Sequence, residues 1–181
     1  MESVNKLEQT VAAWYKDVPH LPKDITKWLA DNAWWIVLIG IALTVVGMVT
    51  ILPAILVGIG LSSAFLPYAP SFITTIAGIA WFSTWVSLAG SVATAAIEAF
   101  AVSPLKTKQK KGWSLLFVAG LVSVVVGLFT SVITANVFGV IGALLGAAIW
   151  GYVLFEVREY FEHKKVSAHK PVAAKKPAAT E

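Results

Sequence analysis

The chain has 181 residues, of which 57% are hydrophobic and 13% are charged, with a net charge of +4 and no cysteine. A soluble domain of this length cannot bury so much apolar surface, because small domains have a high ratio of surface to volume. The composition therefore predicts an integral membrane protein. The lack of cysteine excludes disulfides, thiolate metal sites and cysteine nucleophiles.

Basic residues mark the ends of two apolar runs. The fourteen Lys and Arg residues fall in three clusters, at residues 6–27, 106–111 and 158–176. The intervening runs, 33–97 and 112–155, have no ionisable side chain apart from one tyrosine each. Because cytoplasmic flanks attract Lys and Arg, the three clusters are expected on one side of the membrane. This requires an even number of crossings in each run, and two crossings in each is the economical solution.

Residues 1–33 are expected to form amphipathic helices at the membrane interface. Apolar residues recur every three or four positions before Pro22, and Pro22 is typical of the first turn of a second short helix. Trp and Lys beside such apolar faces favour an interfacial position, with a partner-binding or coiled-coil arm as the alternative. The apolar positions are Val4, Leu7, Val11, Trp14 and Val18 in the first helix, and Ile25, Trp28 and Leu29 in the second.

Residues 34–157 are expected to form a bundle of four transmembrane helices, so the predicted fold class is all-α. A span needs about 20 apolar residues, and backbone groups in hydrocarbon must be bonded within their own segment. The segment 53–66 has two interpretations, an extension of the first helix past Pro53 or a re-entrant piece buried in protein. An overlong, tilted or protruding first pair of helices is favoured. The spans are placed near residues 34–52, 72–102, 113–134 and 138–157.

Tryptophans gather near the ends of the predicted spans. Trp34, Trp35 and Trp113 begin spans, and Trp150 lies in the last turns of another. Amphipathic aromatic rings are enriched at membrane interfaces, so these positions predict an aromatic belt.

The two halves of this region resemble each other. In both halves a tryptophan is followed by two glycines seven residues apart, Gly40 and Gly47 in the first half and Gly120 and Gly127 in the second. Both halves start on the same side, so a duplication would give a parallel repeat. The alternative is that Gly and Val are common in any membrane helix.

Small residues follow one face of each predicted helix. On the second helix Thr84, Ser87, Ser91, Thr94 and Glu98 are spaced three and four residues apart, which places them on one face. Close packing is the first interpretation, since membrane helices associate through small residues and hydroxyl bonds. A hydroxyl-lined path for ions or protons that ends at the glutamate is the second. The glycines expected to pack helices are Gly40, Gly47, Gly120, Gly127, Gly142 and Gly146, the last two in a GxxxG arrangement.

Glu98 is the best single functional candidate, because it lies within the second predicted helix about two turns before the basic loop. An ionisable group at that depth is costly unless it is paired, hydrated or protonated. Glu156 occupies the corresponding place on the fourth helix, so the two carboxylates could share a proton or bind a cation. The alternative is that both extend to headgroup level or pair with Arg158 and nearby lysines.

Residues 158–181 are expected to form a basic cytoplasmic tail, and residues 166–181, rich in Ala, Lys and Pro, are expected to be disordered. Its lysines suit anionic lipid headgroups, at about 1 kcal/mol each near the surface, and no specific nucleic-acid partner is predicted. The three histidines lack the spacing of a metal site, and no hydrolase, P-loop or dinucleotide motif occurs. The sequence therefore predicts no enzyme, no metal and no cofactor.

Short motifs flank the predicted spans, at residues 13–16 (AWYK), 18–22 (VPHLP), 27–32 (KWLADN), 104–106 (PLK) and 110–113 (KKGW). With the four-span plan, they resemble the small inner-membrane proteins of reduced-genome, candidate-phylum bacteria, over most of the chain. The tryptophan-then-glycine repeat is similar to small repeated membrane proteins of the acid-resistance type, in the cores of the first and third helices. These resemblances imply a location in the bacterial inner membrane and assign no activity or functional residue.

The sequence favours a structural or interaction protein of the inner membrane, with both termini cytoplasmic, that self-associates through a glycine face or binds another membrane protein. A small transporter or channel component that uses the hydroxyl stripe and Glu98 is the alternative. The surroundings of Glu98 discriminate between the two. A water-filled vestibule would favour transport, whereas a dry, close-packed or paired carboxylate would favour a scaffold.

Overall fold

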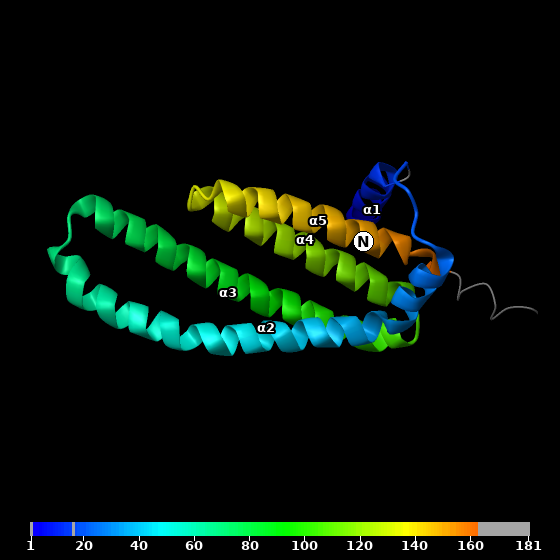
Figure 1. Ribbon diagram of the computed structural model, residues 1–181, viewed down its shortest axis with the longest axis horizontal. Coiled ribbons are helices and arrows are strands. Elements are labelled where there is room, and N and C mark those ends of the chain that lie inside the picture. Colours follow the sequence, from blue (N-terminus) through cyan, green and yellow to red (C-terminus); the bar gives the residue numbers. More distant parts are fainter. Residues whose placement is uncertain (1, 16, 163–181) are drawn as a thin grey trace, which may run out of the picture.

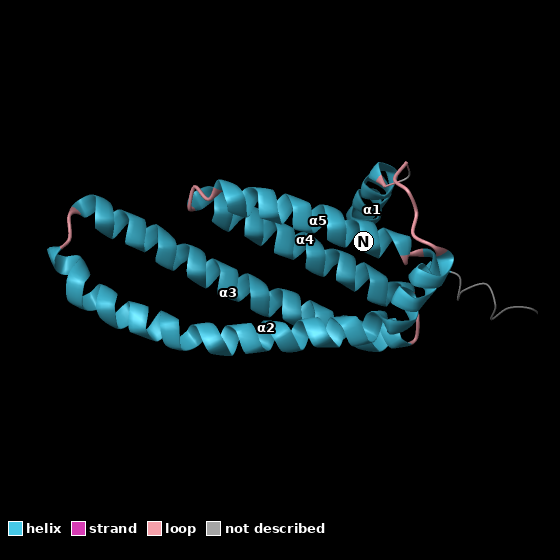
Figure 2. Ribbon diagram, in the orientation of Figure 1, coloured by secondary structure: helices cyan, strands magenta, loops and turns pink. Residues whose placement is uncertain are grey.

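The computed structural model describes residues 2–15 and 17–162, so most of the predicted basic tail lies outside the described residues. Each element in the described part is helical, and short loops connect the helices (Figure 2). The elements are α1 (Glu2–Trp14), α2 (Lys23–Phe65), η1 (Leu66–Tyr68), α3 (Ser71–Lys106), α4 (Lys110–Ile133), α5 (Val137–Glu156) and α6 (Glu159–Glu162).

Four helices are long and apolar enough to cross a membrane, namely α2, α3, α4 and α5. This confirms the predicted all-helical class with four candidate spans. The longest, α2, runs without interruption from Lys23 to Phe65. The second short helix expected after Pro22 is therefore the start of α2, because no helix-breaking residue separates the two segments. Pro53 lies inside α2, so residues 53–65 extend the first helix past the proline, and Leu66 begins η1.

The four long helices lie side by side in chain order. Helix α3 packs against α2 on one side and against α4 on the other, and α4 packs in turn against α5 (Figure 1). No residue is buried in the most apolar stretch of α2. In the most apolar stretches of α4 and α5, only 11% of the residues are buried. The expected bundle is thus an open row with α2 and α5 at its edges.

The two hairpins of this row differ in length. The α2–α3 hairpin extends well past the turn between α4 and α5 (Figure 1). Helix α3 has 36 residues and α4 has 24, a difference of about 18 Å at 1.5 Å per residue. Apolar side chains on the longer hairpin are exposed, including Phe65, Tyr68 and Phe72.

The buried core lies at one end of the row, where α3 ends, α4 begins and α5 ends. We call this end the base. Trp113 is 1% exposed there, stacks on Phe117 at 5.6 Å and donates from Nε1 to the Leu154 carbonyl oxygen at 2.8 Å. Trp113, which the sequence placed in an aromatic belt, is thus a core residue of the protein, with Phe155 edge-on to its ring at 5.4 Å. The core residues are Ala30, Ala101, Leu105, Trp113, Phe117, Leu154, Val157 and Phe161.

Two left-handed residues end α3 and α4. Lys108 has φ 53° and Ala135 has φ 51°. After α3 the Gln109 N–H donates to the Pro104 carbonyl at 2.8 Å and the Lys108 N–H to that of Leu105 at 2.9 Å. This is the Schellman arrangement, which usually has glycine at the left-handed position. Each turn brings the next helix directly back alongside the one before.

Candidate functional site

The predicted hydroxyl stripe on α3 contacts α4 at Thr94. Its five members are partly buried, and Thr94 Oγ1 lies 3.2 Å from Ser123 Oγ on α4. Thr84 Oγ1 donates to the Ala80 carbonyl of its own helix at 2.9 Å. These bonds satisfy hydroxyls within and between helices, which is the packing use of such residues. Ser87 and Ser91 lie on the same face of α3.

The two candidate carboxylates have different surroundings. Glu98 is partly buried on α3, and no hydrogen bond or ion pair joins it to another residue of the described part. Glu156, at the end of α5, accepts from His20 at 2.7 Å and from the Leu21 N–H at 3.2 Å. Its partner is therefore the segment before α2, and not Arg158 or a lysine. The structure does not bring the two carboxylates together as a pair.

The six candidate glycines divide into two groups. Gly120 and Gly127 lie where α4 meets α5, against Trp150 and Ala143 respectively. The other four, Gly40, Gly47, Gly142 and Gly146, have open space where a Cβ would lie. Two therefore pack helices within the chain, and four lie on faces that no other described helix covers.

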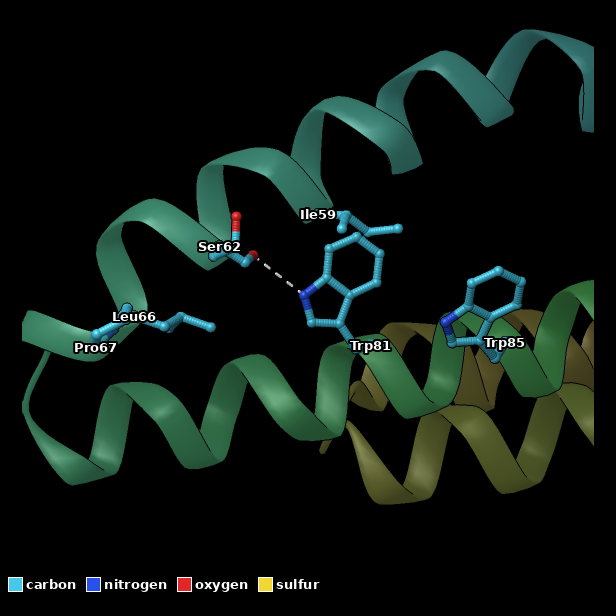
Figure 3. Close-up of a pocket in the computed structure, with 7 residues that line it drawn as sticks. Ile59, Ser62, Leu66, Pro67, Trp81 and Trp85 are labelled. Atoms are coloured by element: carbon cyan, nitrogen blue, oxygen red, sulfur yellow. Dashed lines mark hydrogen bonds between the residues drawn. The ribbon is translucent and has the colours of Figure 1, made fainter.

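A pocket of about 470 Å³ lies between α2 and α3 in the longer hairpin. Figure 3 shows Trp81 projecting from α3 toward α2, with its Nε1–H donating to Ser62 Oγ at 3.2 Å. A Cβ at Gly58 would lie 3.1 Å from the Trp81 ring, so the glycine makes room for it. Trp85 lines the same pocket one turn further along. The lining has no charged residue, which limits this pocket to apolar or weakly polar contacts.

Residues 2–22, without Lys16, form an arm that folds back on the base. Glu8 lies on the face of α1 that contacts the base, and its side chain is only 3% exposed. Glu8 Oε1 lies 2.7 Å from an Arg158 guanidinium nitrogen and 3.6 Å from Lys110 Nζ. A buried carboxylate requires such compensation, because an isolated charge out of water is strongly unfavourable. The guanidinium also lies over the Trp113 ring, 5.6 Å from its centre.

Two tyrosines connect the rest of the arm to α5 through hydrogen bonds and ring stacking. Tyr15 stacks on Phe155 at 5.5 Å and donates to the Ala148 carbonyl at 3.1 Å. Tyr152 donates to the Pro19 carbonyl at 2.6 Å. With the contacts of Glu156 and Glu8, these bonds make up what we call the clasp. Burial raises the pKa of the Tyr15 phenol, which keeps its donor proton in place.

The contact face of α1 differs from the apolar face expected from the sequence. Leu7 and Trp14 are 50% and 72% exposed, whereas Glu8 and Val11 contact the base. A second i, i+3, i+7 series, from Glu8 through Val11 to Tyr15, could have revealed this face. Glu8 made this series look exposed, because an acidic side chain is rarely buried. The cations that compensate Glu8 are more than 100 residues away in the sequence. Val4 lies outside the residues whose side chains are described.

The base also brings opposite charges together at the loop between α3 and α4. Lys108 pairs with Asp31 of α2, and Lys106 Nζ lies 5.0 Å from the centre of the Trp34 ring. Within residues 2–15 and 17–162, no three His, Asp or Glu side chains are grouped closely enough to hold a metal ion. No protein-family model, curated protein or solved structure matches the chain.

Proposed function

We propose that the protein is a structural or interaction protein of the bacterial inner membrane, a scaffold or assembly factor without catalytic activity. The four candidate spans and the exposed apolar side chains along them support a membrane location. The basic residues of the base, Lys23, Lys27, Lys106, Lys110 and Arg158, support a cytoplasmic base with both termini on that side. Anionic lipid headgroups are the expected partners of Lys27 and Lys106, whose side chains are exposed outside the base cavity.

The observation that carries the proposal is the free glycine face of α5, an edge helix. Gly142 and Gly146 have no neighbouring atom where a Cβ would lie, and Leu145 and Ile149 beside them are 59% and 67% exposed. A GxxxG face lets two backbones approach closely in lipid, where packing replaces the hydrophobic drive for association. The row of α2 to α5 also has two open edges, so these four helices do not enclose a pore for ions or solutes. Self-association through α5 is the economical use of this arrangement.

Light scattering of the purified protein in nanodiscs or mild detergent tests this proposal. The wild-type protein is expected to have the mass of a dimer or larger oligomer. The double substitution Gly142→Leu and Gly146→Leu is expected to give the mass of one chain. The matched control is Gly60→Leu with Gly78→Leu, two further glycines with open space around them. A monomeric wild-type protein, or an equal mass for both doubles, contradicts the proposal.

A small transporter or channel component is the second candidate function. The observation in its favour is Glu98, a carboxylate within a candidate span that has no bonding partner among the described residues. Intramembrane acids are typical of ion and proton pathways. Proton and cation flux into proteoliposomes tests it. Flux that depends on the protein and is abolished by Glu98→Gln supports transport, and flux equal to that of empty liposomes supports the scaffold.

A further inference from the structure

A cavity of about 920 Å³ lies at the base, between the arm, the end of α5, α6 and the start of α2. This volume is within the range of about 300–1,000 Å³ that is usual for sites of small molecules. The cavity is built by segments more than 100 residues apart, which the clasp holds together. Neither the scaffold role nor the glycine face makes use of it.

One wall of the cavity is aromatic. Tyr15, Tyr152, Phe155 and Tyr160 line it, and the Tyr15 ring centre is 5.5 Å from that of Phe155 and 6.4 Å from that of Tyr152. The three phenol hydroxyls donate to backbone carbonyls, which fixes the rings in place. Aromatic faces attract organic ammonium ions. This wall is therefore suited to a positively charged amine.

Both signs of charge also line the cavity. Glu156 is committed to His20 and to the Leu21 N–H, and Arg158 is paired with Glu8. Glu159 and Lys23 line the cavity as well, both with exposed side chains. The carboxylate suits an ammonium group, and the lysine at the start of α2 suits a phosphate. The two together match a zwitterion better than a simple anion.

The position of the cavity along α5 indicates where such a ligand comes from. Glu156 directly follows the uncharged run 112–155, so in a spanning α5 the cavity lies at the level of the inner headgroups. A lipid can therefore place its headgroup in the cavity while its chains stay in the membrane.

We propose that the base cavity binds the headgroup of a zwitterionic aminophospholipid, with its ammonium near Glu159 and the aromatic wall and its phosphate near Lys23. This inference rests on the membrane location in the proposed function, and it does not depend on self-association. The bound lipid would join the arm to the base and to the inner leaflet at once.

Native mass spectrometry of the full chain, released from detergent, tests the inference. The protein is titrated with phosphatidylethanolamine, phosphatidylglycerol and phosphatidylcholine of matched acyl chains. Phosphatidylethanolamine is expected to be retained about fivefold more than phosphatidylglycerol, as for the gain of one exposed charge pair. Lys23→Gln with Glu159→Gln is expected to remove this preference. The control, Lys27→Gln with Asp24→Asn, changes the same charges at exposed positions outside the cavity and is expected to keep it.

Several results overturn the inference. Equal retention of phosphatidylethanolamine and phosphatidylglycerol by the wild-type protein does so without any variant, and so does a preference that survives the Lys23 and Glu159 substitutions. Competition by free phosphoethanolamine as strong as by the lipid shows a soluble ligand and overturns the lipid source. The same spectra give the oligomeric mass, so a failure of lipid selectivity is distinguishable from a failure of self-association.

Discussion

The substitution Glu8→Gln is expected to release the arm from the base while leaving the rest of the fold intact. Glu8 is 3% exposed, and its carboxylate compensates Arg158 and Lys110. Removing one partner of a fully buried ion pair costs about 3–5 kcal/mol. The partners here are 25% and 48% exposed, so water compensates them in part after the substitution.

We therefore expect a cost of about 2 kcal/mol, which shifts the docking equilibrium of the arm by about 30-fold. A helix of the length of α1 is marginal in water when it is not packed. Undocking should thus appear as faster hydrogen exchange in α1, by up to the same factor, with unchanged exchange in α4.

The control is Asp17→Asn, which removes the same charge at an exposed position of the arm. It is expected to leave exchange in α1 within about twofold of the wild-type rate, as for a surface substitution. Unchanged protection of α1 in Glu8→Gln would refute the buried ion pair as the basis of docking. Faster hydrogen exchange throughout the chain would refute the claim that the arm undocks without unfolding the row of long helices.

Three further changes test other contacts. Gly120→Ala is expected to lower stability by about 2 kcal/mol in denaturant unfolding, because the added Cβ overlaps the Trp150 ring. Ala135→Gly is expected to raise stability by about 1 kcal/mol, because it relieves a left-handed residue with φ 51°. Raising the pH above about 10 is expected to loosen the arm, measured by a spin-label distance from α1 to α5. The pKa of the Tyr15 phenol is raised by burial, so its contribution is complete below the unfolded pKa and is lost as the pH rises through the folded pKa.

Matched variants accompany these three tests. Gly127→Ala meets its nearest atom at 3.6 Å and is expected to be neutral or stabilising, so equal losses at both glycines would contradict the packing assignment. A loss of stability in Ala135→Gly would contradict the strain at that turn. Tyr15→Phe is expected to make the arm less sensitive to alkaline pH, and an unchanged pH response would show that another group controls it.

The number and type of the long helices could be predicted from the sequence, because the lengths of the uncharged runs constrain them directly. The arrangement of those helices could not. Residues that face lipid are as apolar as residues that face another helix, so periodicity does not distinguish an open row from a bundle. The continuity of α2 through Pro53 stayed ambiguous, since a proline is tolerated in a membrane helix when neighbouring groups compensate for the lost bond.

Less of the candidate site could be predicted. Glu98 and Glu156 were equivalent by position, but only the structure reveals that His20, 136 residues away, engages one of them. The inward position of Glu8 was hidden because its compensating cations belong to other elements. Gly120 and Gly142 were likewise equivalent in sequence, although one meets Trp150 and the other meets nothing. In each case tertiary contacts over long separations decided the role.

Cysteine cross-linking in membranes tests self-association through α5 most directly. The chain has no cysteine, so Leu145→Cys introduces a unique thiol beside Gly142 and Gly146. The account predicts that oxidation converts this variant to a covalent dimer, and that Val125→Cys, at an exposed position of α4, stays monomeric. No dimer from Leu145→Cys, or equal cross-linking at both positions, would contradict it.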